Sequence, residues 1–169
     1  MLAPRRLALS LSLSLLLAAP LAHADEGNGG GTPNALVINP GDLFNGVISI
    51  EYERALNSFF GITLGASIGL FKGVFAPPAG AYYTAGGPEL GVRFHFIRDA
   101  PGGLWLGPSV NLYYVAGRAF GYGIGAAIGY NFVIGRHFLL QLGIGGGFND
   151  YGDGIQWSPR LRLGIGGVF

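Results

Sequence analysis

The sequence predicts an all-β protein, an eight-stranded antiparallel up-and-down transmembrane β-barrel. Three observations predict it. Residues 119–132 carry apolar side chains at even positions and mostly glycine at odd ones, and successive side chains of a strand point to opposite faces. The same alternation recurs along the chain. Only 11% of the residues are charged, whereas roughly a quarter is typical of soluble domains, so this composition favours a barrel exterior that faces lipid.

The N-terminal region predicts export. Residues 1–24 combine two arginines, an apolar run and an Ala-His-Ala site, which together indicate a secretory signal peptide cleaved after Ala24. An uncleaved membrane anchor is the alternative, but the apolar run is short and polar residues follow it. We expect residues 25–33 to form a flexible periplasmic lead-in and residues 34–169 to form the barrel.

The first two strands are expected at 34–38 and 47–53, and two turn candidates lie between them. Residues 39–42 read Asn-Pro-Gly-Asp, and residues 45–46 read Asn-Gly, a dipeptide typical of hairpins. The first candidate is preferred because it keeps the proline out of the hydrogen-bond ladder and the aspartate out of lipid.

The next two strands, 59–71 and 89–97, repeat the alternation with Phe, Ile, Leu and Val on one face. Between them, residues 72–88 are rich in Ala, Gly and Pro and contain three aromatic side chains. We expect this segment to be the longest extracellular loop and a possible contact with a surface partner.

The last four strands follow at short intervals, and Gly, Pro, Asp or Asn marks most of the turns. They are expected at 104–115, 119–132, 137–149 and 157–169, with turns at 99–103, 116–118, 134–136 and 150–154. If Phe169 ends on the periplasmic side, the total of eight strands is even, as single-chain bacterial barrels require. Membrane helices are disfavoured because the charge-free runs fall short of ~20 residues.

Charged side chains are expected on the inward face of this barrel. They are Glu51, Glu53, Glu89, Arg93, His95, Arg160 and Arg162. An ion-pair network that plugs a narrow bore is the favoured interpretation, because buried charges need partners. A gated polar conduit and a catalytic cluster are the alternatives. The many inward glycines leave open whether large side chains fill the interior or a cavity remains.

The residues give no support for an enzyme. Lipid A deacylases of the small-barrel type need a His-x-Ser unit and the palmitoyltransferase type needs an Asp-Ser pair, and neither occurs. The chain has no cysteine, and its two histidines after residue 24 lie on separate strands, so we expect no metal and no cofactor. Removing residues 1–24 takes away two arginines and leaves a net charge of −1, which argues against nucleic-acid binding.

The C-terminus resembles the signal that outer-membrane barrels present to their assembly machinery. Arg162, Gly164 and Phe169 match its polar, glycine and aromatic positions, and Gly167 departs from the larger apolar residue that is usual there. The resemblance implies two classes of partner during biogenesis, periplasmic chaperones and the barrel-assembly machinery.

More broadly, the chain resembles a family of small, poorly characterised outer-membrane barrels. The resemblance rests on Asn-Pro at 39–40, Gly46, Glu-Tyr-Glu-Arg-Ala-Leu at 51–56, and the segments 89–94 and 103–108. It implies an architecture like that of OmpX and the OmpA barrel, in the outer membrane of a Gram-negative cell. The function expected is a non-enzymatic scaffold with short surface loops and a plugged interior. A narrow pore or carrier for a small solute or lipid is the alternative, and a lipid-modifying enzyme comes third.

Overall fold

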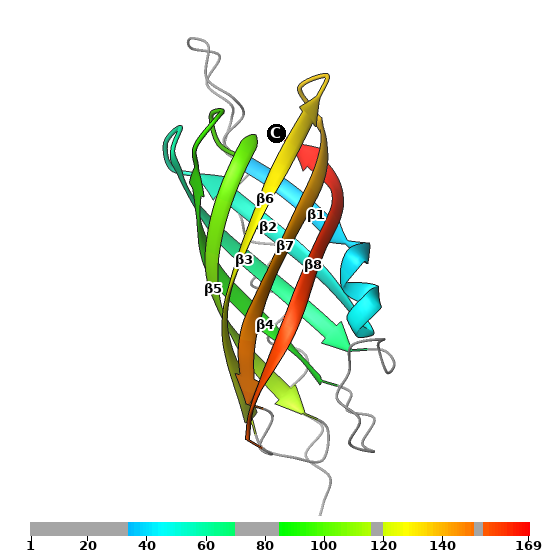
Figure 1. Ribbon diagram of the computed structural model, residues 1–169. Coiled ribbons are helices and arrows are strands. Elements are labelled where there is room, and N and C mark those ends of the chain that lie inside the picture. Colours follow the sequence, from blue (N-terminus) through cyan, green and yellow to red (C-terminus); the bar gives the residue numbers. More distant parts are fainter. Residues whose placement is uncertain (1–33, 70–84, 116–119, 151–153) are drawn as a thin grey trace, which may run out of the picture.

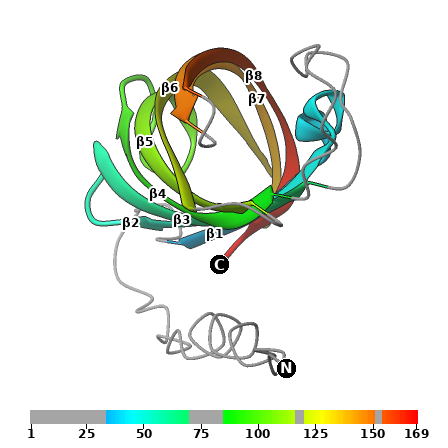
Figure 2. The ribbon, with the colours of Figure 1, turned by 90° about the horizontal axis from the view of Figure 1, so that it is seen from below.

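The computed structural model describes residues 34–69, 85–115, 120–150 and 154–169, which form one closed antiparallel barrel (Figure 1). Each strand pairs with its neighbours in chain order, and β1 pairs with β8 to close the ring (Figure 2). The elements are β1 (Asn34–Asn39), the 3-10 helix η1 (Pro40–Asn45), β2 (Val47–Ala55), β3 (Phe60–Gly69), β4 (Ala85–His95), β5 (Gly103–Val115), β6 (Phe120–Ile134), β7 (Phe138–Asp150) and β8 (Ile155–Val168). The predicted fold, a closed eight-stranded up-and-down barrel, is confirmed. In the described residues, no helix is both long and apolar enough to cross a membrane.

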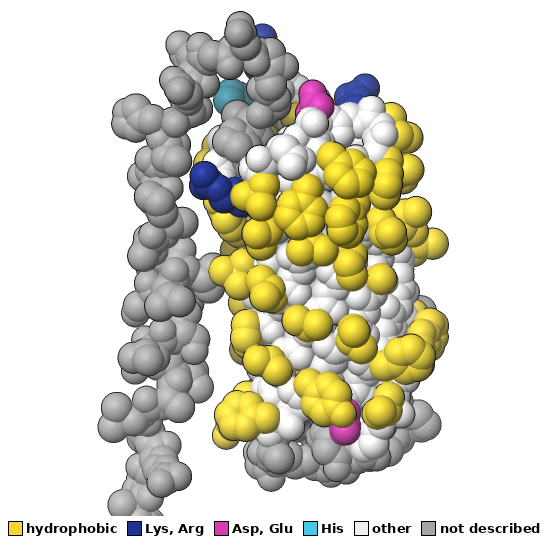
Figure 3. Space-filling model, turned by 90° about the vertical axis from the view of Figure 1, so that its left-hand side faces the viewer, with side chains coloured by type: hydrophobic (Ala, Val, Ile, Leu, Met, Phe, Trp, Pro, Cys, Tyr) yellow, Lys and Arg dark blue, Asp and Glu magenta, His cyan; other side chains and the backbone are white. Residues whose placement is uncertain are grey.

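The two faces of each strand differ as the alternation predicts. In β6, the inward Asn131 is 1% exposed while its outward neighbour Phe132 is 41% exposed. Inward side chains occupy odd positions in the strands up to β7 and even positions in β8, where Arg162 is buried and Ile165 is exposed. The outer surface consequently carries many apolar side chains (Figure 3). The polar side chains of the strands are mainly buried in the bore.

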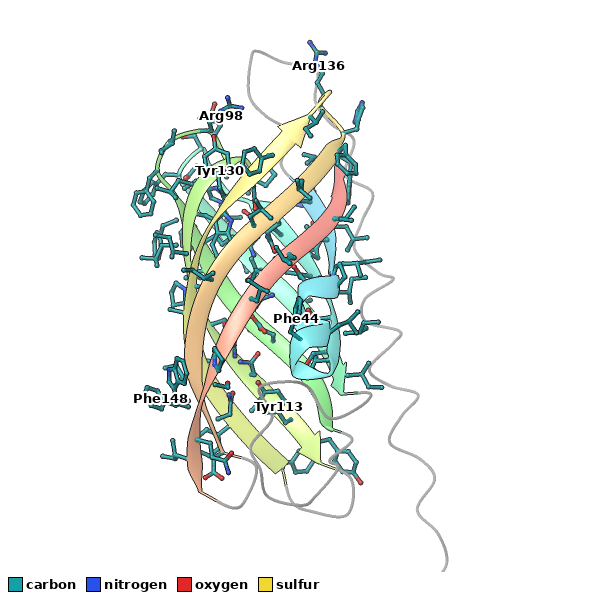
Figure 4. All side chains as sticks on the ribbon, turned by 45° about the vertical axis from the view of Figure 1, so that its right-hand side comes forward. Phe44, Arg98, Tyr113, Tyr130, Arg136 and Phe148 are labelled. Carbon is teal, nitrogen blue, oxygen red and sulfur yellow. The ribbon has the colours of Figure 1, made fainter. Side chains whose placement is uncertain are left out.

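Outward aromatic side chains gather toward the two ends of the barrel. Tyr130 lies near the end that carries the C-terminus, and Phe148 lies near the other (Figure 4). At the C-terminal end the ring of Phe59 contacts those of Phe94 and Phe96 with centroids 5.7 and 5.6 Å apart. The sequence places such residues in two girdles, periplasmic and outer. They are Tyr52, Phe60, Phe96, Tyr130, Phe132, Phe138 and Phe169, and then Phe44, Tyr114, Phe120, Tyr122, Phe148 and Trp157.

β4 begins earlier than the sequence predicts. Residues 85–88, which we assigned to the loop 72–88, belong to this strand, and Pro88 pairs with Ala66 of β3. The ladder to β5 is interrupted at Gly87 and Pro88, because a proline has no N–H to donate. A proline usually argues against a strand, so a segment containing Pro88 was assigned to the loop. The residue is accepted in β4 because the ladder to β5 is interrupted at this point. The rest of that loop lies outside the described residues.

The first hairpin uses both turn candidates in one longer connection. η1 follows β1 directly, and Gly46 ends it in the left-handed conformation at φ 75°. The prediction of a tight turn at 39–42 is therefore wrong, although Pro40 does lie outside the ladder. β1 pairs with β8 only as far as Ile165, and beyond that point η1 packs against β8 and β2 (Figure 2). A short helix thus replaces part of a strand in the barrel wall.

Candidate functional site

The structure brings all seven predicted interior residues together in one connected network. Five of them are almost fully buried, and the side chains of Glu89 and Arg160 keep 15% and 11% of their exposure. They come from β2, β4 and β8, which are not all neighbours in the sheet. Their side chains therefore meet across the bore rather than along one wall.

The half of the network nearer the C-terminal end centres on Glu53. His95 Nε2 lies 2.7 Å from one oxygen of this carboxylate, and Arg93 Nη1 lies 2.7 Å from the other. The remaining ring nitrogen of His95 lies 2.8 Å from the carbonyl oxygen of Gly102. Arg93 also donates to Glu51, so its guanidinium joins two carboxylates.

The other half continues from Glu51. Arg162 donates to Glu51 at 3.1 Å and to Glu89 at 2.5 Å. Arg160 lies 3.5 Å from the same oxygen of Glu89 and donates to Ser109 at 3.1 Å. The bore thus holds an unbroken chain in which every acid lies between two bases. Its order is His95, Glu53, Arg93, Glu51, Arg162, Glu89 and Arg160.

Strand register explains how the acids come close to their partners without crowding. Glu51 pairs with Gly65 on β3, and Gly65 pairs in turn with Glu89 on β4. A glycine therefore separates two carboxylates that point the same way. A Cβ at Gly65 would lie 3.2 Å from the carbonyl oxygen of Ile50 and 3.4 Å from the Cβ of Glu89, so a larger residue would require these neighbours to shift.

Neutral polar side chains complete the network, and sequence reasoning missed them. The amide oxygen of Asn131 accepts a hydrogen bond from the Trp105 indole at 2.9 Å, and its nitrogen donates to Pro101 at 2.7 Å. In the amide orientation that satisfies both groups, Gln141 accepts from both Nη atoms of Arg93 at 3.0 Å. These residues occupy inward positions of β5, β6 and β7, and that facing was the available signal.

Asp42 is the most informative residue that the sequence misplaced. It was expected in a turn at 39–42, but it lies in η1 and its carboxylate accepts a hydrogen bond from Ser49, which faces the bore. Because η1 lies in the barrel wall, this side chain reaches the interior charges from the side. With Asp42, four carboxylates face three arginines and His95.

The position of Trp105 shows what fills the interior beside the inward glycines. Its indole lies on the bare backbone of Gly129 and Gly143, where added Cβ atoms would lie 2.5 and 3.1 Å from the ring. The Arg93 guanidinium carbon lies over the same ring, 4.2 Å from its centroid. Large side chains therefore fill the glycine-lined half of the bore. Among the charged residues remains a void of about 10 Å³, roughly the room that one water needs.

A larger pocket of about 460 Å³ opens at the C-terminal end. The polar groups at its base already have partners inside the protein, since Asn131 is hydrogen-bonded at both atoms and the Gly102 carbonyl faces His95. Its lining residues are Ile97, Arg98, Asp99, Pro101, Gly102, Asn131, Val133 and Val168. None of these residues belongs to the ion-pair chain, and Asn131 joins the pocket to Trp105 through its hydrogen bond.

The residues of the C-terminal motif have distinct structural positions. Arg162 belongs to the ion-pair chain, and a Cβ at Gly164 would lie 2.7 Å from the side chain of Asn39. Phe169 is 48% exposed, and its backbone forms two hydrogen bonds with Asn34 at 3.1 and 3.0 Å. The first two residues therefore support the barrel itself, whatever part the motif plays in assembly.

Neither catalytic nor metal chemistry is evident in the described residues. They contain no group of three His, Asp or Glu side chains that is able to hold a metal ion. Both ring nitrogens of His95 already have partners, a carbonyl oxygen and a carboxylate, so neither is paired with a hydroxyl nucleophile. No protein-family model, curated protein or solved structure matches this chain.

Proposed function

We propose that this protein is a non-enzymatic outer-membrane scaffold, a barrel whose bore is closed by its own ion pairs. The observation that carries the proposal is the chain in which three carboxylates alternate with three arginines and His95, together with the small void left around it. A solute that crossed the bore would have to separate buried ion pairs, each of which costs several kcal/mol to break.

The outer surface supports insertion into a membrane. At the outward positions of the described strands, the charged residues are Arg54 and Asp150, and each lies at the end of its strand. The residues between them are mainly aliphatic or aromatic, and a closed barrel leaves few backbone groups without a partner in lipid. The predicted signal peptide and C-terminal motif support the outer membrane as the location.

The narrow-pore alternative receives less support. It needs a continuous polar path, and the glycine-lined wall that offered one is occupied by Trp105. A carrier would need a binding cavity that continues through the bore. The void among the charged residues holds about one water, and the polar groups at the base of the larger pocket at the C-terminal end already have partners. Contacts with other molecules are therefore expected at the outer surface and at the connections, including a surface partner at the loop that follows β3.

Electrical recording tests the closed bore. We expect the purified, refolded protein to give no steady conductance in a planar lipid bilayer. The same preparation should change its gel mobility on heating, which shows that a folded barrel is present. Steady single-channel steps from the wild-type protein would overturn the scaffold proposal and favour the pore.

Cell fractionation tests the location. We expect the protein in the outer-membrane fraction, with Asp25 as its N-terminal residue. Deleting Phe169 should lower the assembled amount without lowering synthesis. Recovery of the wild-type protein from the soluble periplasm, or with Met1 intact, would contradict the proposed location.

A further inference from the structure

The end of the barrel that carries the C-terminus also carries exposed basic side chains. Arg98 and Arg136 lie there, at the end opposite Phe148 (Figure 4). Arg54 lies at the same end, because its strand partner Asn34 is hydrogen-bonded to the C-terminal residue. Among the exposed residues that the structure describes at this end, Asp99 is the one acid, so basic side chains predominate.

Arg54 differs from the other two because it points outward from a strand. It pairs with Ile62 of β3, which is 40% exposed on the apolar outer surface, and it is itself exposed. No other described residue forms an ion pair with it. An arginine on an apolar surface is stable when its stem lies along that surface and its guanidinium reaches a polar layer.

Two polar groups lie beside Arg54 on the same outer face. The Tyr52 hydroxyl donates to the Asn34 side chain at 2.7 Å, and Asn34 donates to the Phe169 carbonyl at 3.2 Å. This polar patch consists of the exposed Arg54, the partly exposed Tyr52 and the largely buried Asn34.

The neighbouring aromatic cluster fixes the level of this patch. The rings of Phe60 and Phe94 lie 5.5 Å apart on the adjacent strands, one pair beyond Ile62 and Val92 toward the barrel end. Aromatic rings of membrane barrels gather where the hydrocarbon meets the headgroups. Basic side chains appear at the same end of the surface view (Figure 3).

We propose that this rim binds the headgroup phosphate of an anionic glycerophospholipid, with Arg54 as the main contact. Guanidinium groups bind phosphate oxygens through two parallel hydrogen bonds, and the apolar surface beside Ile62 accommodates the acyl chains. Excess positive charge at this end favours a lipid with net negative charge over a zwitterionic one. The inference rests on the proposed function, because it requires the barrel to be inserted in a bilayer.

The end assignment agrees with this lipid class. Outer-membrane barrels have short turns on the periplasmic side and longer loops outside. The C-terminal end has connections of 56–59, 96–102 and 135–137, while the longest connection, between β3 and β4, lies at the other end. The rim then faces the periplasmic leaflet, which is the side expected to offer glycerophospholipids.

Native mass spectrometry of the refolded protein tests this site. Micelles contain equal amounts of phosphatidylglycerol and phosphatidylcholine, and the lipids retained on the protein are counted. We expect the wild-type protein to favour phosphatidylglycerol and Arg54→Gln to lose about fivefold in affinity for it, the effect of one basic side chain near an anionic lipid surface. Arg54→Lys, the matched control, should retain most of the preference because it keeps the charge.

Different results test the proposed headgroup site and the proposed membrane insertion on which it rests. If the wild-type protein fails to insert into vesicles, as judged by its heat-dependent gel mobility, the proposed membrane function fails. If it inserts but retains both lipids equally, or if Arg54→Gln retains as much phosphatidylglycerol as the wild type, the headgroup site alone is refuted. A second mixture pairs phosphatidylglycerol with a phosphorylated glycolipid, and a preference for the glycolipid in that mixture would also refute the site.

Discussion

Removing the charge of Glu51 is the sharpest test of the ion-pair chain. This carboxylate is 4% exposed and joins the two halves of the chain through Arg93 and Arg162. Glu51→Gln keeps the shape of the side chain but leaves two buried guanidinium groups with one carboxylate fewer. Breaking a buried pair typically costs 3–5 kcal/mol. Because each arginine keeps another acid, at 2.7 and 2.5 Å, we expect a loss of about 3 kcal/mol.

Urea unfolding of the refolded barrel measures this loss. The fluorescence of Trp105 is measured in a Trp157→Phe background, because Trp157 is exposed on the outer surface and also fluoresces. The remaining signal reports on the bore, since the Trp105 ring is buried and lies 4.2 Å from the Arg93 guanidinium carbon. Glu51→Gln should lower the unfolding midpoint with an unchanged slope. Asp99→Asn, at an exposed acid in a connection, is the control and should change stability by no more than about 0.5 kcal/mol.

A double-mutant cycle separates charge balance from lost packing. Arg162→Met in the Glu51→Gln background removes a base along with the acid, so the double variant should lose clearly less stability than the two single changes together. Losses that add within about 0.5 kcal/mol would show that the two side chains act independently. The reasoning about an electrostatically closed bore would then be refuted.

Three further predictions follow from the same structure. Gly129→Ala should cost about 1–3 kcal/mol of unfolding free energy, because the new Cβ would lie 2.5 Å from an indole carbon. Gly167→Ala, whose new Cβ would have its nearest neighbour at 3.5 Å, should be nearly neutral. Equal effects of the two changes would contradict the packing argument. Ile128→Arg should cost about 2–4 kcal/mol in a bilayer, and Ser109→Asp, which lies 3.1 Å from an arginine, far less; similar losses would argue against a lipid-facing exterior. Gly41→Val should destabilise the wall formed by η1, since the new Cβ would lie 2.6 Å from a backbone nitrogen of β8. We expect a lower unfolding midpoint together with a leak in bilayer recordings. An unchanged midpoint would refute the close contact.

The strands and their facing followed from the sequence because alternation is a local property. Residues 120–132 specify which face is apolar without reference to any other strand. Membership of the ion-pair chain followed in the same way, since an inward position is known once the parity of a strand is known. Glu51, Arg93 and Arg162 were therefore identified without knowledge of their partners.

What depended on the register between strands did not follow from the sequence. That Trp105 lies on Gly129 and Gly143 requires β5, β6 and β7 to be aligned, and alternation within one strand does not fix that alignment. The position of Asp42 was not predicted correctly for a related reason. Its path into the bore exists because β1 ends at Asn39 and η1 completes the wall, a choice that depends on packing against β8.

The glycines and the charges of this barrel are two parts of one packing solution. Three long arginines and an indole need space that an eight-stranded bore does not offer when every inward position carries a side chain. β6 and β7 provide that space by presenting backbone at Gly125, Gly129 and Gly143, against which Arg160 and Trp105 lie. A larger residue at one of these glycines would displace Arg160 or Trp105. Removing one of those two side chains would in turn leave empty space beside the glycine backbone. The bore is therefore expected to tolerate paired changes across it far better than single ones, which the Glu51 and Arg162 cycle measures directly.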